Sequence, residues 1–216
     1  MWITNSGSAT VTKLGVSDGS LQGTFSVPAS PTGIVFDGKS IWVAINGNSG
    51  NELVRLQVAD GTILSTVPLI NGPLCLATDG TNIWVTLATI NMVAKVQISD
   101  GMVLGNFPVG EHPQGIAFDG TDMWIANVGS ATISVLQVSD GSLVRTITTG
   151  QGPLGMAFDG ANMWVANYDA MTAQEFRAID GTLLGTFRLP SQPSDAAFDG
   201  ANIWIAIQST NVIVKL

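Results

Sequence analysis

Side chains that could carry out catalysis are scarce in this 216-residue chain. The only histidine, His112, directly follows Glu111, and the chain holds just two other glutamates. Metal catalysis needs several converging ligands, commonly histidines together with carboxylates. A Ser-His-Asp triad can be imagined around His112, but no strained nucleophile turn accompanies that histidine. We therefore expect no catalytic residue, no metal site and no cofactor.

Departures from a regular internal repeat are the candidates for a binding site, because copies kept only for structure should stay alike. The candidate binding residues are Glu111, His112, Tyr168, Asp169, Asn127, Asn167, Gln151 and Asp195. An asparagine lies three residues after the tryptophan in only half of the copies of the repeat. The loops that follow are therefore more polar in some copies than in others. Asp195 takes a position where the other copies carry glycine or Cys75. We expect Cys75 to be a small buried residue and not a nucleophile.

Six tryptophans mark the copies of the repeat, and they are 40 residues apart with one interval of 42. They are Trp2, Trp42, Trp84, Trp124, Trp164 and Trp204. No copy can bury its own apolar face, so neighbouring copies must stack. We expect the tryptophans to pack between adjacent copies, where large aromatic side chains contribute most.

Each copy contains four short apolar segments separated by turns, and their β-branched content predicts strands. In the fourth copy they are Gln114–Phe118, Met123–Ala126, Thr132–Val138 and Leu143–Thr148. The chain opens on a second strand, Trp2–Thr4, and closes on a third strand, Asn211–Leu216, which gives 22 strands.

Six four-stranded blades would need about 24 strands and five blades about 20. The sequence therefore predicts one all-β propeller domain over residues 1–216 that starts and ends within a repeat. We expect six blades with incomplete closure, with five blades and a fragment of a longer chain as alternatives. Unpaired strands at the gap would be a place where a second copy of the chain could pair.

The net charge of −8 comes mostly from turns. Ten of the 13 aspartates precede glycine, a turn sequence in which Asp bonds nearby backbone and Gly accepts a positive φ. Spaced along the repeat, these aspartates are not expected to surround a calcium ion. The few Lys and Arg residues argue against a nucleic-acid partner. No apolar run is long enough to span a membrane, and a single cysteine permits no intrachain disulfide.

The repeat combines a proline, Gly-Ile-Ala-Phe-Asp-Gly, Trp-Val-Ala-Asn and a Thr/Val-rich strand that ends in Ser-Asp-Gly. It resembles the blades of YVTN and NHL-type β-propellers, closest to virginiamycin B lyase-like proteins. The resemblance implies that first strands line a central channel, and that the loops after the Trp strand and before the proline share one face. It also implies a bacterial-type protein outside the cytoplasm, although the chain shows no signal peptide. Virginiamycin-type lyases use histidines, a glutamate and a divalent metal, a set that this chain lacks.

The sequence therefore predicts a non-catalytic scaffold that presents loops to a protein, a peptide or a glycan, since blades of this type also serve as binding platforms. One alternative is a lyase or hydrolase of the virginiamycin B lyase-like type, with its site at the channel mouth near Asp195 and His112. Another is a recently amplified or engineered repeat fragment without a selected function.

Overall fold

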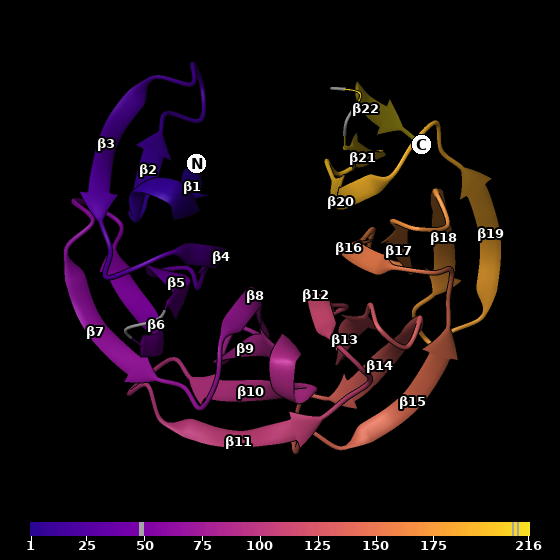
Figure 1. Ribbon diagram of the computed structural model, residues 1–216, viewed down its shortest axis with the longest axis horizontal. Helices are drawn as coiled ribbons and strands as arrows, with labels where there is room; N and C mark the ends of the chain where they lie inside the picture. Colours follow the sequence, from indigo (N-terminus) through magenta and orange to yellow (C-terminus); the bar gives the residue numbers. More distant parts are fainter. Residues whose placement is uncertain (48–49, 209, 211) are drawn as a thin grey trace. The chain divides into compact units, whose positions relative to one another are not determined.

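The computed structural model describes residues 1–47, 50–208, 210 and 212–216, and almost all of its regular structure is β-strand (Figure 1). The strands form six antiparallel sheets, which are the blades of a β-propeller, so the expected fold class is confirmed. The chain divides into two compact units, Met1–Asn106 and Phe107–Leu216.

The first unit begins with a three-stranded sheet and continues with two four-stranded sheets. The first sheet contains β1 (Trp2–Asn5), β2 (Thr10–Leu14) and β3 (Leu21–Ser26). The second contains β4 (Pro31–Phe36), β5 (Ser40–Gly47), β6 (Gly50–Gln57) and β7 (Ile63–Pro68). The third contains β8 (Pro73–Thr78), β9 (Asn82–Leu87), β10 (Met92–Gln97) and β11 (Val103–Pro108), and the boundary between the units falls within β11. Two short 3₁₀ helices, η1 (Ser6–Ser8) and η2 (Ala88–Ile90), follow β1 and β9.

The second unit holds two four-stranded sheets and one three-stranded sheet. The fourth sheet contains β12 (Pro113–Phe118), β13 (Asp122–Asn127), β14 (Thr132–Gln137) and β15 (Leu143–Thr148). The fifth contains β16 (Pro153–Phe158), β17 (Asn162–Asn167), β18 (Thr172–Arg177) and β19 (Leu183–Arg188). The sixth contains β20 (Pro193–Phe198), β21 (Ile203–Ile207) and β22 (Val212–Lys215).

The described residues thus form 22 strands, as the repeat predicts, and the first and last sheets have three strands each. The first sheet begins with a second strand of the repeat, and the sixth ends with a third strand. The expected start of that last strand, Asn211, lies outside the described residues, and β22 begins at Val212.

Tryptophans pack against the second strand of the next blade, as expected. Trp124 on β13 belongs to one buried cluster with Met163 and Val165 on β17. The same arrangement joins Trp42 to Ile83 and Val85, and Trp164 to Ile203 and Ile205. Because each ring fills the space between two sheets, its burial makes neighbouring blades of a unit depend on each other.

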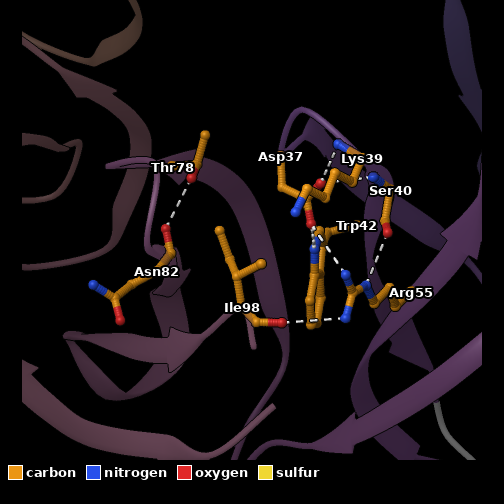
Figure 2. A network of polar contacts seen from close by, with 8 residues as sticks. All are labelled: Asp37, Lys39, Ser40, Trp42, Arg55, Thr78, Asn82 and Ile98. Atoms are coloured by element: carbon orange, nitrogen blue, oxygen red, sulfur yellow. Dashed lines mark hydrogen bonds and ion pairs between the residues drawn. The ribbon is translucent and has the colours of Figure 1, made fainter. Parts of the chain in front are cut away.

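An aspartate holds each of these rings, as Figure 2 shows for the second blade. Asp37 accepts hydrogen bonds from the backbone N–H of Lys39 at 2.7 Å and of Ser40 at 2.6 Å, and from Trp42 Nε1 at 2.7 Å. The four following blades repeat the bond from the tryptophan to the aspartate five residues earlier, at 2.6 to 2.9 Å. One carboxylate therefore closes the turn between first and second strands and also orients the indole.

The guanidinium of Arg55 lies over one face of the Trp42 indole in the second blade (Figure 2). The Arg55 guanidinium lies 5.3 Å from the ring centroid of Trp42. Its Nε donates to Ser40 Oγ at 2.9 Å, and its Nη1 donates to the carbonyl oxygen of Ile98, in the next blade, at 3.2 Å. This side chain therefore links two successive blades while it packs on the aromatic face.

The other Asp-Gly aspartates close the turns between third and fourth strands. Asp60 Oδ1, for example, accepts the backbone N–H of Thr62 at 3.0 Å. The same bond forms at Asp18, Asp100, Asp140 and Asp180. All ten Asp-Gly aspartates thus accept backbone N–H groups, so the acidity of the chain is mainly turn chemistry, as predicted.

First strands lie side by side within each unit, and each carries a bulge just after its proline. Glycine at the bulge permits the close approach. A Cβ at Gly115 would overlap the carbonyl oxygen of Leu154 on the neighbouring first strand, and one at Gly33 would overlap that of Leu74. The repeated glycine is therefore a packing requirement.

Candidate functional site

The loops that carry most of the candidate residues form one surface of the second unit, which we call the loop shelf. It consists of residues 109–112, 128–131, 149–152 and 168–171. Within the fourth blade, Gly129 N–H donates to the carbonyl oxygen of Glu111 at 2.9 Å. Within the fifth blade, Tyr168 N–H donates to the carbonyl oxygen of Gly152 at 2.7 Å. Each blade thus pairs the loop before its first strand with the loop after its tryptophan strand.

A further backbone bond joins the shelf across the two blades. Thr149 N–H donates to the carbonyl oxygen of Ala131 at 3.1 Å, which connects the 128–131 loop to the 149–152 loop. The four loops are therefore one continuous hydrogen-bonded surface, even though they are far apart in sequence.

Five of the eight candidate residues lie on the loop shelf. Glu111, His112, Gln151 and Asp169 are exposed, and Tyr168 is half-buried. The Asp169 carboxylate lies against the backbone of Gly152, where an added Cβ would come within 2.5 Å of Oδ2. The shelf therefore combines carboxylates, an amide, an imidazole and one aromatic ring on backbone that is held in place.

His112 adopts a backbone conformation that is uncommon for a residue with a side chain. Its φ is 53°, in the left-handed region, and the residue that takes its place in the next blade, Gly152, has a φ of 68°. The other non-glycine residues with positive φ in the described chain, Ala9, Asn91, Ala131 and Met171, all occupy the repeat position seven residues after a tryptophan. His112 is the exception among these residues, because it lies in the loop before a first strand. Its backbone strain therefore belongs to this loop and not to the repeat.

Asn127 and Asn167 lie beneath the shelf and are fully buried. Asn127 Nδ2 donates to Thr132 Oγ1 at 3.1 Å and to Ser134 Oγ at 3.0 Å on the third strand. The amide nitrogen of Asn127 thus bonds side chains of the neighbouring strand. Asn5 donates in the same way to Thr10 and Thr12. Asn167 donates to Thr172 and Gln174.

The sequence contains a signal for this network that position-by-position comparison missed. Where the asparagine is present, the two facing positions of the third strand are polar, and where it is replaced by Leu87 those positions are Met92 and Ala94. Ile207 faces Val212 and Val214 in the same manner. A buried amide needs polar partners and an apolar side chain does not, which explains this pairing. The second blade follows it only in part, because Ile45 faces Glu52 and Val54.

The amide oxygens of Asn127 and Asn167 differ in their surroundings. Asn167 Oδ1 accepts a hydrogen bond from Thr149 Oγ1 at 2.9 Å, but the equivalent of Thr149 in the preceding blade is Val109. Among the residues that the structure describes, Asn127 Oδ1 consequently has no hydrogen-bond partner, although it is buried. An unmade bond of this kind destabilises the folded state.

Asp195 lies away from the loop shelf, on β20, where it replaces the bulge glycine of the repeat. Its Cα and Oδ1 lie against Gly155 of the neighbouring first strand, which leaves no room for a Cβ there. Asp195 is exposed to solvent, but partial desolvation of its carboxyl against the neighbouring strand raises the pKa, and the hydrogen bond that Oδ1 accepts from Ala196 N–H offsets part of this. Cys75 occupies the same repeat position in the third blade and is half-buried.

The described ranges hold no group of three or more His, Cys, Asp or Glu side chains placed to bind a metal ion. The pattern Gly-x-Ser-x-Gly occurs once, at residues 15–19, but it forms the turn between β2 and β3 and not a strand-to-helix turn. In the part of the chain that the structure covers, no helix has the length and apolar character needed to cross a membrane.

Comparisons with known proteins identify the fold and no more. No protein-family description and no curated protein sequence matches the chain. Among solved structures, the crystal structure of a functionally unknown protein from Desulfotomaculum acetoxidans DSM 771 is similar, with a TM-score of 0.81. The match covers 100% of this chain and 78% of that one at 16% sequence identity. At that identity the likeness establishes a β-propeller architecture and carries no function.

Proposed function

We propose that this β-propeller is a non-catalytic platform whose loop shelf binds a protein, a peptide or a glycan. The observation that carries the proposal is that the side chains departing from the repeat project from loops joined by backbone hydrogen bonds. Exposed polar residues on rigid loops are the usual way in which a scaffold fold acquires a binding surface.

The chemistry of the shelf suits a polar ligand. Glu111 and Asp169 offer carboxylate acceptors, Gln151 offers both donor and acceptor atoms, and Tyr168 supplies a ring. Aromatic rings beside hydrogen-bonding groups are enriched where proteins recognise partners. The strained backbone of His112 fits this role, because strain retained at an exposed position points to a requirement other than stability.

Asn127 and Asn167 act in this proposal as supports for the loops. Ser134 Oγ and Gln174 Oε1, which both contact these asparagines, also accept the backbone N–H groups of Gly110 at 3.3 Å and of Gly150 at 2.8 Å. The buried amides would therefore set the position of the loops that carry Glu111 and Gln151.

The likeness of the repeat to YVTN, NHL and virginiamycin B lyase-like blades, and the location outside the cytoplasm that it implies, are part of this proposal. A lyase or hydrolase is the second candidate, and the raised pKa of Asp195 favours it because a carboxyl of this kind can hold a proton. This candidate predicts a higher melting temperature with Mg²⁺, Mn²⁺, Ca²⁺ or Zn²⁺. A melting curve that none of these ions changes would argue against it.

The binding proposal is tested by screening the protein in parallel on a glycan array and against a displayed random-peptide library. The Tyr168→Ala, His112→Ala double variant should lose at least about ten-fold in affinity for the ligands that are found. Asn46→Ala is the matched control, because Asn46 takes the place of Tyr168 in the second blade. Its N–H donates to the carbonyl oxygen of Ser30, as that of Tyr168 donates to Gly152. Equal affinity of all three proteins, or no ligand from either screen, would refute the proposal.

A further inference from the structure

The sequence contains two Asn-Gly pairs, Asn46-Gly47 and Asn71-Gly72, and an isoleucine precedes each of them. Asparagine is a thermolabile residue, because the main-chain nitrogen of the following residue can attack its side-chain amide. A glycine at the following position presents no Cβ to obstruct this attack. Since the two pairs share this local sequence, a difference in reactivity between them in the folded protein comes from the structure.

Asn71 lies in the loop before β8, and its side chain folds back over the main chain. Its Oδ1 accepts a hydrogen bond from the backbone N–H of Gly72 at 2.6 Å. The side-chain carbon Cγ, which is bonded to Oδ1, is therefore held beside the nitrogen that must attack it. Holding two reacting groups together in advance accelerates a reaction, because their encounter no longer depends on chain motion.

A second donor acts on the same oxygen. The hydroxyl of Thr89, on η2 after the tryptophan strand of this blade, donates a hydrogen bond to Asn71 Oδ1. Attack on Cγ turns Oδ1 into an oxyanion, and a hydrogen-bond donor that is already in place stabilises that charge. Thr89 is exposed and Asn71 is half-buried, so water can reach the site.

Asn46, in the other pair, lies in different surroundings. It belongs to β5 and pairs with Asn51 on β6, so its backbone is extended. Side chains of a strand stand roughly perpendicular to the sheet. The Asn46 amide is directed toward the next blade, where a Cβ added at Gly72 would come within 2.7 Å of Asn46 Oδ1. The structure thus prepares Asn71 for attack by the following nitrogen and directs Asn46 elsewhere.

We propose that Asn71 is a site of self-modification, at which the folded protein converts this asparagine into aspartate and isoaspartate. The Gly72 nitrogen forms a bond to Asn71 Cγ and gives up its proton, Nδ2 takes up a proton and leaves as ammonia, and a succinimide ring remains. Water then opens the ring at either of its two carbonyl carbons, which gives aspartate or isoaspartate. Either product adds a negative charge to the loop before β8.

The test incubates the full 216-residue protein at about 37 °C and pH 8 and measures conversion at both asparagines by mass spectrometry. Trypsin separates them, because it releases Asn46 within residues 40–55 and Asn71 within residues 56–95. Conversion at Asn71 should be at least about ten-fold faster than at Asn46 in the folded protein, whereas the two rates should be similar in concentrated urea. Part of the product should be isoaspartate, since direct hydrolysis of the amide gives aspartate alone. Equal rates in the folded protein, or aspartate as the sole product, would overturn the proposal.

Variants separate the contribution of Thr89 from that of the loop. Thr89→Val keeps the shape of the side chain but removes the donor, and it should slow conversion at Asn71 about ten-fold. Thr81→Val is the matched control, because Thr81 is an exposed threonine of the same blade whose hydroxyl donates to Asp79 Oδ1. This control should convert at the rate of the natural protein. A Thr89→Val rate equal to that of the control would refute the role of the Thr89 hydroxyl.

Discussion

Replacing Asp37 by alanine tests whether the Asp-Gly turn before the tryptophan strand holds the propeller blades together. The Asp37 side chain is 1% exposed and accepts three hydrogen bonds. Two of the donors, the N–H groups of Ser40 and Trp42, belong to residues that are 3% and 0% exposed, so water cannot easily replace the carboxylate. Each buried donor left without a partner costs about 1–3 kcal/mol. We therefore expect Asp37→Ala to lower the free energy of unfolding by about 2–6 kcal/mol.

The matched control is Asp60→Ala, which changes the other Asp-Gly turn of the same blade. Asp60 is exposed and accepts one backbone N–H, from Thr62, in a turn that water can reach. Urea denaturation followed by circular dichroism should show a midpoint about 1–2 M lower for Asp37→Ala and nearly unchanged for Asp60→Ala. Equal shifts for the two variants would refute the reasoning, because the loss of a turn residue would then explain both.

The pH dependence gives this prediction a second measurement. Burial alone would raise the pKa of Asp37, but the hydrogen bonds from Trp42, Ser40 and Lys39 and the charge of Arg55 together hold it below its ordinary value. A carboxyl with a lowered pKa in the folded state stabilises the protein above its unfolded pKa, about 4, and loses this contribution as the pH falls. The unfolding midpoint of the natural protein should therefore drop more steeply below about pH 4 than that of Asp37→Ala.

Three further predictions concern the candidate residues. Val109→Thr should supply a hydrogen-bond donor to Asn127 Oδ1 and raise the free energy of unfolding by about 1 kcal/mol, measured by urea denaturation. An unchanged free energy of unfolding would show that Asn127 Oδ1 is already satisfied. His112→Gly should relieve the left-handed strain and add about 0.5–1 kcal/mol, and a lower unfolding midpoint would contradict this. Asp195→Asn should raise the melting temperature at pH 7 but not below about pH 4. The reason is that a carboxyl whose pKa is raised by folding destabilises the folded protein as it ionises. An equal gain in melting temperature at both pH values would exclude that cause.

How far the sequence predicts the binding surface differs from residue to residue. The departures at Glu111–His112 and at Tyr168–Asp169 are visible in the sequence, because the other copies provide a reference for each position. The backbone bond from Thr149 to Ala131, which joins the loops of the two blades, is not visible in the sequence, because it depends on how two sheets lie against each other. The burial of Asn127 and Asn167 is likewise a consequence of packing.

The amino-acid sequence alone determined the repeat, the number and order of the strands, the interblade position of the tryptophans and the turn role of the Asp-Gly pairs. These features follow from local chemistry and from a period that every copy repeats, so each blade confirms the others. Only the tertiary structure decided which loops meet, that Asp195 packs against Gly155, and that Trp2 lines a pocket between the first two blades. Contacts between distant segments depend on strand register and on which neighbour each sheet packs against, and these are set by the fold as a whole.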